Sequence, residues 1–366
     1  MTGAKPVICI VDGSADVSGA FVAARREASL LGDVAEFVLL MSDKSRIPED
    51  QLRSFARVYR LPIVSLRRSA WSALAYIPAL LRCSLEIHRI LRRERCGRLQ
   101  FNDFHFAHGA VLRALGYRGR IVTWVRLDPR MFGKIGALWL ALARRSSDRL
   151  VAVSEFIRRR VGLPGTEILF DPTPDVPVLG VSTAEPVLVF MGSYQRVKGQ
   201  DAAIEAFDRI ARRHGDARLA FYGSDMGLPG SIAFLDRLRD RARRGDGAGR
   251  IEFRPAVGDP AEVLKLARAA LCLSRTEPFG LVCQEASACG IPVIATRSGG
   301  PEEIIEDGVS GYLVDVDDVA AIAARMDELL SDAALARKLG LAGAELVRTR
   351  FPAADYKAAF RNVFDL

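Results

Sequence analysis

Short apolar runs and longer amphipathic segments alternate along most of the chain. Residues 7–11 and 187–191 contain no charged side chain and have the length of buried strands. Residues 200–213 instead repeat apolar side chains at the spacing of a helix. This alternation predicts parallel sheets whose strands are joined by right-handed helical crossovers.

The same pattern places the elements of both halves. In the first half, the predicted strands are residues 7–11, 34–41, 61–66, 99–101, 121–125 and 149–153, and the predicted helices are 19–31, 72–95, 134–145 and 155–161. In the second half, the strands are residues 187–191, 218–222, 251–253, 269–273, 291–295 and 311–314, and the helices are 200–213, 232–244, 260–269, 280–289, 319–330, 333–350 and 353–366. Ser154 is expected to cap the helix that follows it.

The chain predicts two domains, because its 366 residues exceed the roughly 250–300 that one core usually supports. A proline-rich stretch with little periodicity interrupts the alternation. We therefore predict an α/β protein of two doubly wound, Rossmann-like domains that face a central cleft. The domains are residues 1–165 and 187–350, joined by a linker at 166–186 that holds one strand at 167–170. The last helix, at 351–366, is expected to pack back toward the N-terminal domain.

The composition of the chain bears on its cellular environment and on the kind of partner it binds. The formal charge of +8 is compatible with an ordinary basic surface and with attraction to phosphates or to an anionic membrane face, and it does not choose between these interpretations. The six cysteines form no C-x-x-C pair, so buried thiols are favoured over a zinc site and no metal is expected. The N-terminus enters a strand directly without signal-peptide features, and no apolar run reaches the ~18 residues of a spanning helix. These features predict a cytoplasmic protein.

One predicted helix, residues 72–95, has a strongly basic end. Cations suit a helix C-terminus, so a solvated helix end is the favoured interpretation. The alternative is a patch that rests on an anionic membrane surface. The apolar residues of this amphipathic helix are Leu74, Ile77, Leu81, Leu85, Ile87 and Leu91.

The candidate chemistry concentrates in residues 274–303. Two carboxylates, Glu277 and Glu285, stand at the start of a predicted helix and inside it. Hydrolysis by paired acids needs both carboxyls to flank one bond, which this placement disfavours. A division of roles fits better: the helix N-terminus at Gly280 and Leu281 attracts a diphosphate, Glu285 accepts hydrogen bonds from ribose hydroxyls, and Glu277 binds the group attached to the phosphate.

A second anion site is predicted in the loop at 192–199, which follows a buried strand and precedes a helix. Arg196 and Lys198 add positive charge there. The loop does not match the G-x-x-x-x-G-K-[ST] phosphate loop. By itself the loop is more typical of an ordinary connection with solvated cations.

The sequence resembles a known enzyme family. The motifs are EPFGLVCQE at 277–285, GIPVIATRSGGPEEII and DGVSGYLVDVDD after it, MGSYQRVKGQDAAIEAF around the loop at 192–199, and VAVSEFIRR at the end of the first half. Together they resemble the retaining glycosyltransferases of family 4, which have the GT-B architecture. The match is specific over roughly residues 186–350 and looser before that.

This resemblance implies roles in the second domain. Glu277 contacts the sugar hydroxyls, Glu285 the ribose, and Lys198 neutralises the diphosphate. Many members carry Arg where this chain has Ser193, and Arg196 is expected to take over that contact. The donor-binding set comprises Gly192, Ser193, Gly223, Phe279, Gly280, Leu281 and Glu285, and the catalytic set comprises Glu277, Lys198 and Arg196.

In the first domain the resemblance implies an acceptor side that this chain has altered. The family's Gly-rich loop is reduced to Ser18-Gly19-Ala20, and Arg126 stands near the position where many members have a His. Asp103 and His105 follow a predicted strand and can line the cleft. Gly19, Asp103, His105 and Arg126 are therefore the candidate acceptor residues.

The implied activity is the metal-independent, retaining transfer of a hexose from a nucleotide-diphosphate sugar, with no cofactor besides the donor. The acceptor is a glycan, a lipid-linked or a small molecule in cell-surface polysaccharide or glycolipid synthesis, with peripheral association to the inner membrane face and no nucleic-acid partner. Two alternatives remain: a non-catalytic relative that binds a nucleotide sugar or a protein, and a GT-B enzyme of different chemistry.

Overall fold

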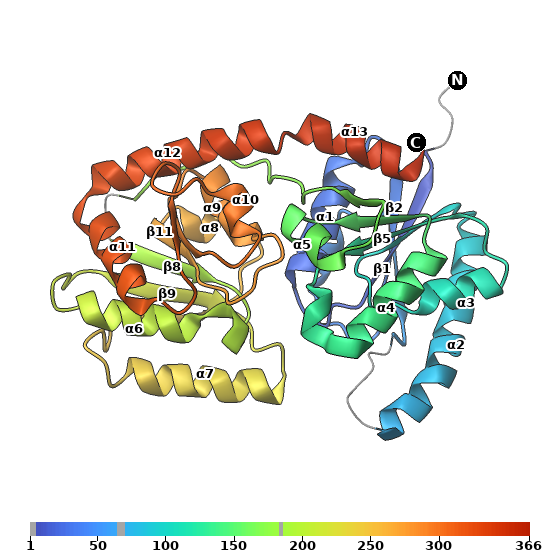
Figure 1. Cartoon of the computed structure of the whole chain (residues 1–366), viewed down its shortest axis with the longest axis horizontal. Helices are drawn as coiled ribbons and strands as arrows, with labels where there is room; N and C mark the ends of the chain where they lie inside the picture. The colour runs from blue at the N-terminus through green and yellow to red at the C-terminus, as the bar shows by residue number, and fades with distance from the viewer. Residues whose placement is uncertain (1–4, 64–69, 183–185) are drawn as a thin grey trace. The chain divides into compact units, whose positions relative to one another are not determined.

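The computed structural model describes residues 5–63, 70–182 and 186–366, and for residues 70–75 only the backbone. The chain divides into two compact units (Figure 1). The first comprises Met1–Pro172 together with Ala353–Leu366, and the second comprises Thr173–Pro352.

The first unit is built on a sheet of seven parallel strands in the order β3-β2-β1-β4-β5-β6-β7. Its central strands are apolar and buried, as expected where helices cover both faces. The strands are β1 (Val7–Asp12), β2 (Glu36–Ser42), β3 (Arg57–Leu61), β4 (Arg98–Phe101), β5 (Arg120–Val125), β6 (Arg149–Ala152) and β7 (Thr166–Ile168).

Two helices of this unit begin at serine N-caps. Ser18 accepts a hydrogen bond from the Phe21 amide to start α1, and Ser154 accepts one from the Ile157 amide to start α5, as predicted. The helices are α1 (Gly19–Leu30), α2 (Ala70–Arg93), α3 (His108–Ala114), α4 (Gly133–Ser146), α5 (Glu155–Val161) and α13 (Ala353–Phe364), with single 3₁₀ turns η1 (Glu49–Leu52) and η2 (Pro129–Phe132).

The C-terminal helix α13 belongs to the first unit although it follows the second in the chain. Phe360 and Phe364 pack against Trp124 of β5 in the core. The helix end is also held by side chains from the sheet, because Arg98 Nε donates to the Phe364 carbonyl over 3.0 Å and Arg120 Nε to the Val363 carbonyl over 2.7 Å. These donors satisfy carbonyls that a helix C-terminus leaves without intrahelical partners.

The second unit has six parallel strands in the order β10-β9-β8-β11-β12-β13. They are β8 (Val187–Met191), β9 (Arg218–Gly223), β10 (Ile251–Pro255), β11 (Ala267–Cys272), β12 (Val293–Thr296) and β13 (Tyr312–Val314). The helices are α6 (Gln200–Ile210), α7 (Pro229–Ala242), α8 (Ala261–Leu264), α9 (Leu281–Ala288), α10 (Pro301–Ile304), α11 (Val319–Ser331) and α12 (Ala333–Arg350), with the 3₁₀ turn η3 (Arg196–Lys198).

Both sheets therefore have a topological switch point, where strand order reverses direction. In the first unit it lies between β1 and β4, and in the second between β8 and β11. Ligands of open α/β sheets bind outside the carboxyl ends of the strands at such points. The loops after these four strands thus define where sites are expected.

Three predictions about elements need correction, and one helix was missed. The third strand is Arg57–Leu61 and not residues 61–66, of which 64–66 lie outside the described residues. The helix expected at 260–269 ends at Leu264, because the chain then enters β11 at Ala267. The strand expected inside the linker is β7, which pairs with β6, so the first unit extends past residue 165. The short helix α3 was not predicted.

Candidate functional site

The switch point of the second sheet brings together the loop at 192–199 and the segment at 273–280. The first follows β8 and the second follows β11, and these strands are adjacent and parallel. Arg275 N donates to the Val197 carbonyl over 2.7 Å, which joins the two loops directly. The two stretches singled out from sequence therefore form one site, although about 80 residues separate them.

Lys198 and Glu277 form the ionic centre of this site. The ammonium nitrogen of Lys198 lies 2.8 Å from Oε2 of Glu277. Ser274 donates its hydroxyl to the same oxygen over 2.7 Å. Both side chains are partly buried. Two donors on one oxygen fix the carboxylate and leave its other oxygen, Oε1, as the acceptor that can receive a ligand hydroxyl.

The charge of Lys198 is held by its partner. Burial would lower the pKa of Lys198, but the Glu277 carboxylate beside it raises the pKa by attraction and hydrogen bonding, and the net shift is upward. Lys198 is therefore a cation throughout the neutral range. It can stabilise negative charge that develops on a leaving group without first taking up a proton.

The backbone after Glu277 turns tightly and uses glycines at positions where a Cβ would not fit or would be strained. Glu277 N donates to the Ser298 carbonyl over 3.1 Å, and Gly300 N donates to the Glu277 carbonyl over 2.8 Å. A Cβ on Gly300 would lie 2.2 Å from the Phe279 carbonyl oxygen, so no larger residue fits. Gly280 has φ of +100°, which disfavours any residue with a Cβ at the start of α9.

Helix α9 begins at this turn with its first amides unpaired by helix geometry and no acidic side chain in its first turn. Its positive end, at Leu281, is therefore available to an anion. Glu285 lies one turn further along the same face and is buried, with 6% of its surface exposed. This placement is compatible with the predicted division of roles, in which an anion binds at Gly280 and Leu281 and a pair of hydroxyls binds at Glu285.

The loop at 192–199 is held by side chains on both sides. Gln200 Nε2 donates to the Ser193 carbonyl over 2.8 Å, and Gln195 Nε2 to the Ser193 hydroxyl over 3.0 Å. Gly192 N donates to the Tyr222 carbonyl over 2.9 Å, beside Gly223 at the end of β9. The predicted donor residues Gly192, Ser193 and Gly223 thus lie on adjacent strand ends.

Arg275 is a residue of the site that the sequence did not point to. Its guanidinium donates to the Arg196 carbonyl and contacts the carboxylates of Asp201 at 3.2 Å and Asp317 at 2.7 Å. It therefore fixes the backbone of the turn that carries Lys198. The side chain of Arg196 is exposed. The sequence contained one signal that could have identified this residue: Arg275 stands two residues before Glu277, in a loop that was already singled out.

In the first unit, the predicted acceptor residues follow β1 and β4. Gly19 opens α1 and is exposed, and Asp103 and His105 follow β4. His105 Nδ1 lies 3.9 Å from Asp103 Oδ2, beyond hydrogen-bond reach, and the ring stacks on Phe106. Burial raises the pKa of Asp103, while the nearby His105 opposes the shift. The switch point of this sheet brings these three residues to one edge.

Arg126 does not fit the predicted acceptor role. It is buried, and its guanidinium forms ion pairs with Glu27 at 2.7 Å and with Asp171. Its Nε donates to Asn102 Oδ1 over 2.9 Å. The guanidinium is directed into an internal polar cluster that ties α1 and the segment after β7 to the sheet, and this prediction is therefore corrected.

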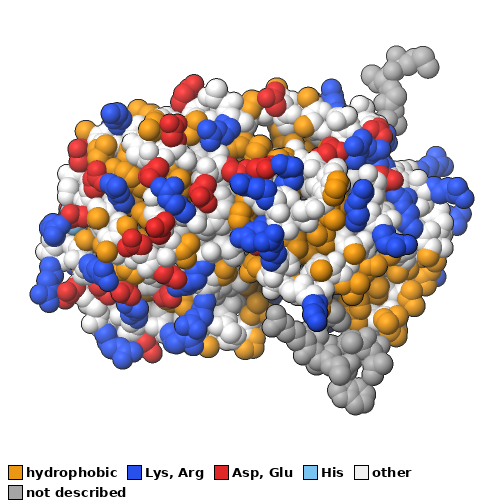
Figure 2. Space-filling view, in the orientation of Figure 1, with side chains coloured by type: hydrophobic (Ala, Val, Ile, Leu, Met, Phe, Trp, Pro, Cys, Tyr) orange, Lys and Arg blue, Asp and Glu red, His pale blue; other side chains and the backbone are white. Residues whose placement is uncertain are grey.

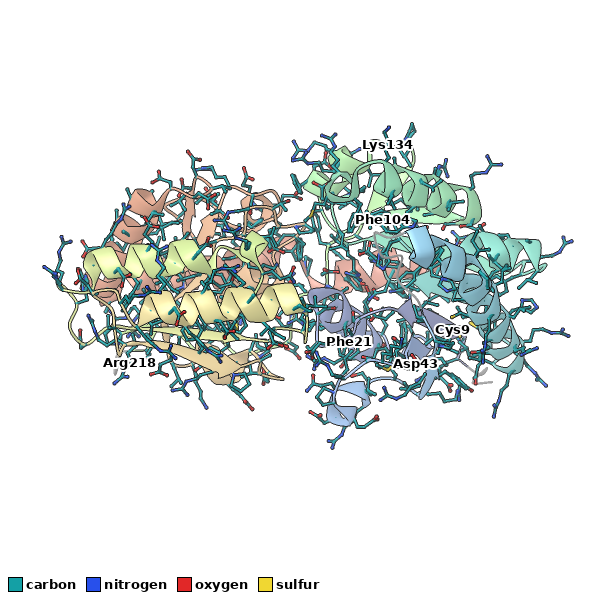
Figure 3. The ribbon with its side chains drawn as sticks, turned by 90° about the horizontal axis from the view of Figure 1, so that it is seen from below. Cys9, Phe21, Asp43, Phe104, Lys134 and Arg218 are labelled. Atoms are coloured by element: carbon teal, nitrogen blue, oxygen red, sulfur yellow. The ribbon has the colours of Figure 1, made fainter. Side chains whose placement is uncertain are left out.

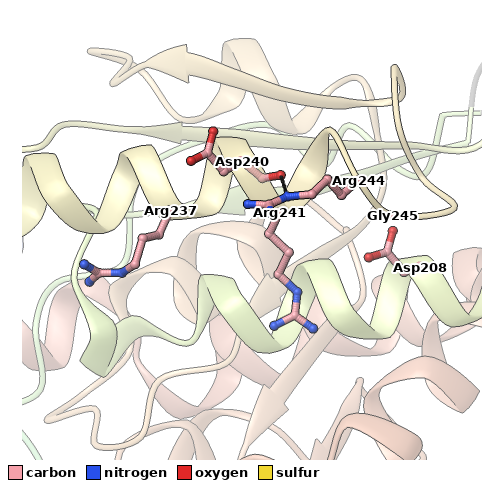
Figure 4. Close-up of a pocket in the computed structure, with 6 residues that line it drawn as sticks. All are labelled: Asp208, Arg237, Asp240, Arg241, Arg244 and Gly245. Carbon is pink, nitrogen blue, oxygen red and sulfur yellow. Dashed lines mark hydrogen bonds between the residues drawn. The ribbon is translucent and has the colours of Figure 1, made fainter.

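A separate hollow of about 500 Å³ lies between α6 and α7 (Figure 4). Its charged groups have partners of their own: Arg241 pairs with Glu205 at 2.8 Å, and Asp208 accepts the Gly247 amide over 3.0 Å. It is lined by Asp208, Arg237, Asp240, Arg241, Arg244 and Gly245. The site at Lys198 and Glu277 is the stronger candidate, because it combines an ion pair, a helix N-terminus and a switch point.

Comparison with known sequences finds relatives of the second unit. Residues 174–346 match the family described as glycosyl transferases group 1. One relative is N-acetyl-alpha-D-glucosaminyl L-malate synthase of Bacillus anthracis, 30% identical over 185 residues that cover 50% of this chain and 46% of the relative. Another is the GDP-mannose-dependent alpha-(1-6)-phosphatidylinositol monomannoside mannosyltransferase of Mycolicibacterium smegmatis, 37% identical over 169 residues, or 43% of this chain and 42% of the relative. The matched region spans less than half the length of either relative.

Comparison of folds extends over both units. Anabaena HepE in complex with UDP-glucose matches with a TM-score of 0.81 at 17% identity, over 98% of this chain and 99% of that one. Sucrose-phosphate synthase from Thermosynechococcus elongatus matches with a TM-score of 0.80 at 18% identity, over 99% of this chain and 98% of that one. The chain has the GT-B fold of two Rossmann-like domains, which confirms the predicted fold class.

Proposed function

Since its second unit belongs to the glycosyl transferases group 1, we propose that this protein is a retaining glycosyltransferase of the family 4 type. It transfers a hexose from a nucleotide-diphosphate sugar to an acceptor hydroxyl. The observation that carries the proposal is the pair Lys198–Glu277 at the switch point, next to the N-terminus of α9. A cation, a fixed carboxylate and a helix N-terminus match the phosphates and the sugar of such a donor.

Each group has a role in the proposed step. Lys198 and the amides at Gly280 and Leu281 hold the diphosphate, and Glu277 accepts hydrogen bonds from the sugar. The bond between the anomeric carbon and the phosphate oxygen breaks, and the acceptor oxygen bonds to the same face of that carbon. The acceptor proton passes to an oxygen of the departing nucleoside diphosphate. Electrostatic stabilisation of that leaving group is the main contribution of the protein.

No metal ion and no cofactor besides the donor take part in the proposed reaction. Lys198 supplies the positive charge that a divalent cation would otherwise supply to the diphosphate. In the part of the chain that the structure describes, no cluster of three or more His, Cys, Asp or Glu is arranged to hold a metal. A direct test is whether sugar transfer survives an excess of EDTA.

The proposed acceptor is a glycan, a lipid-linked or a small molecule used in cell-surface polysaccharide or glycolipid synthesis. One relative of the second unit is named for the transfer of mannose to a phosphatidylinositol lipid. Peripheral association with an anionic membrane face is part of the proposal, because lipid-linked acceptors lie at a bilayer. None of the helices described combines the length and apolarity needed to cross a membrane.

The function is tested by incubating the purified protein with UDP-, GDP- and ADP-sugars and measuring free nucleoside diphosphate. Turnover with one donor, and a product that keeps the anomeric configuration by NMR, is the expected result. An inverted product would contradict the retaining step, and the absence of release with every donor and a panel of acceptors would contradict the transferase.

A second candidate function is a non-catalytic relative that binds a nucleotide sugar. It is favoured by the altered first unit, where Arg126 is committed to internal partners. Tight donor binding that survives Glu277→Ala, together with an absence of turnover, would favour this alternative.

A further inference from the structure

Helix α2 exposes several of the apolar side chains that mark it as amphipathic. Ile77 is 61% exposed, Leu81 46% and Leu85 42%. The described residues of α2 that pack into the core are Leu80, Cys83, Ser84, Ile87 and Leu91. In the part of α2 whose side chains the structure describes, one apolar stripe is therefore buried against the rest of the unit and a second is largely exposed.

The exposed stripe has a regular form. Ile77, Leu81 and Leu85 are four residues apart, so they line one side of the helix over two turns. Arg82 and Arg89 flank this stripe, and Arg92 and Arg93 follow it in the last turn, all exposed. Long arginine side chains can keep their charge in the headgroup region while an apolar stripe enters a bilayer.

A neighbouring helix repeats the arrangement. Helix α4 exposes Leu138, at 58%, and Ile135, and it ends in Arg144 and Arg145. Helix α3 packs against both α2 and α4, so the three helices are neighbours in the first unit. Figure 2 shows hydrophobic side chains gathered over α2 beside Lys and Arg, and Figure 3 shows Lys134 pointing outward from the start of α4.

The charge on α2, α3 and α4 indicates what binds to their exposed surface. They carry eight Lys or Arg and a single carboxylate, Glu86, which itself lies 3.5 Å from Arg82. A surface that is apolar along its centre and basic at its edge complements an anionic lipid bilayer, in which acyl chains lie beneath phosphate headgroups. A protein partner would have to match both properties over the same two helices.

We propose that the exposed faces of α2 and α4 are a docking surface for an anionic lipid bilayer. Ile77, Leu81 and Leu85 enter the interface, and the arginines of α2 and α4 contact lipid phosphates. The inference deepens the peripheral association within the proposed function by naming its surface. It reverses the interpretation of the basic end of α2 as merely a solvated helix terminus.

The test is sedimentation of the full chain with vesicles, which needs neither donor nor acceptor. The wild-type protein is expected to sediment with vesicles of phosphatidylglycerol and phosphatidylcholine and to remain in solution with phosphatidylcholine alone. Raising the salt to about 0.5 M should release it, because screening removes the lipid phosphate contacts. No binding to the anionic vesicles, or equal binding to both compositions, overturns the proposal.

Variants separate the two halves of the surface. Leu81→Ser combined with Leu85→Ser should reduce vesicle affinity by about tenfold or more, since two aliphatic side chains no longer enter the bilayer. Arg89→Gln, Arg92→Gln and Arg93→Gln together should weaken binding and flatten its salt dependence. The matched control is Val309→Ser with Leu341→Ser, which removes two equally exposed aliphatic side chains from the second unit.

Two further outcomes would also overturn the proposal. Equal binding by the Leu81/Leu85 variant and wild type overturns the proposal. So does a solution mass near twice 40.0 kDa that falls to one chain in this variant, because a second copy then covers the face. Release of nucleoside diphosphate with a water-soluble acceptor is measured on the same variants. The variant should lose vesicle binding and retain turnover. Wild-type turnover without vesicle binding would overturn this surface alone, whereas vesicle binding without turnover would overturn the transferase alone.

Discussion

The ammonium of Lys198 lies 2.8 Å from Glu277 although 79 positions separate the two residues in the chain. Ser274 donates to the same carboxylate oxygen, so the acid is fixed before any ligand arrives. A lysine in this position can bind phosphate with its remaining hydrogens while it still contacts the carboxylate. The pair therefore joins the phosphate side of the site to its sugar side.

Lys198→Met should lower kcat for sugar transfer by about 100-fold to 1,000-fold, the cost of losing one preorganised electrostatic contact to a developing charge. The measurement is steady-state release of nucleoside diphosphate. Glu345→Gln, a change at an exposed position of α12, is the control and should leave turnover unchanged. A kcat within about twofold of wild type would remove Lys198 from the proposed step.

Glu277→Gln should separate sugar binding from nucleotide binding. The variant is expected to lower kcat/KM for the complete nucleotide sugar by about tenfold or more, because a hydrogen bond to a charged acceptor is weakened. Its affinity for the nucleoside diphosphate alone, measured by calorimetry, should be unchanged or higher, since that ligand lacks the sugar. Equal losses for both ligands would place Glu277 at the phosphates instead.

Glu285→Gln should weaken binding of the nucleoside diphosphate about tenfold, because the ribose hydroxyls lose a charged acceptor. The sharper measurement compares the diphosphate with its 2′,3′-dideoxy analogue. Wild type should lose affinity for the analogue, whereas the variant should bind both ligands equally. If the analogue discriminates equally well in both proteins, Glu285 does not contact the ribose.

Arg275→Lys should raise KM for the donor several-fold with a smaller effect on kcat. A lysine cannot reproduce the forked contacts to the Arg196 carbonyl, Asp201 and Asp317, so the turn that carries Lys198 loosens. The control is Arg149→Lys, which loosens a comparable ion pair with Glu167 in the first unit. Equal kinetic effects from the two variants would show that the Arg275 contacts have no special role.

Much of the fold follows from local pattern. The central strands consist mainly of buried apolar residues, and Ser154 fixes the start of a helix, so these elements were predicted closely. The carboxylates Glu277 and Glu285 were visible because a turn with Pro278 and Gly280 and a helix start lie between them. Their environment was also predictable, since both belong to one strand, loop and helix unit.

The rest depends on contacts that sequence spacing does not encode. Arg126 follows a strand, as a cleft residue would, but Glu27 of α1 and Asp171 after β7 bind it inside the unit. Helix α2 has apolar residues on two sides, and only packing decides which side is covered. Arg275 acts through backbone contacts to a loop 79 residues away.

The polar cluster around Arg126 makes a prediction for the stability of the first unit. Arg126→Met leaves the carboxylates of Glu27 and Asp171 buried without their cation, which should destabilise the unit by about 3–5 kcal/mol. All three tryptophans, Trp71, Trp124 and Trp139, belong to this unit. Their fluorescence during urea unfolding therefore reports on it separately from the second unit.

The loss should also depend on pH with a definite sign. Burial raises the pKa of Glu27, and Arg126 opposes that shift, so the variant raises this pKa further. An acid whose pKa is higher in the folded than in the unfolded state contributes stability at low pH and loses it as pH rises. The deficit should be smallest near the unfolded value of about 4.3 and grow toward neutrality. Glu27→Gln added to Arg126→Met should recover part of the stability at neutral pH; a deficit that is constant with pH and unaffected by the second change would contradict the buried ionic cluster.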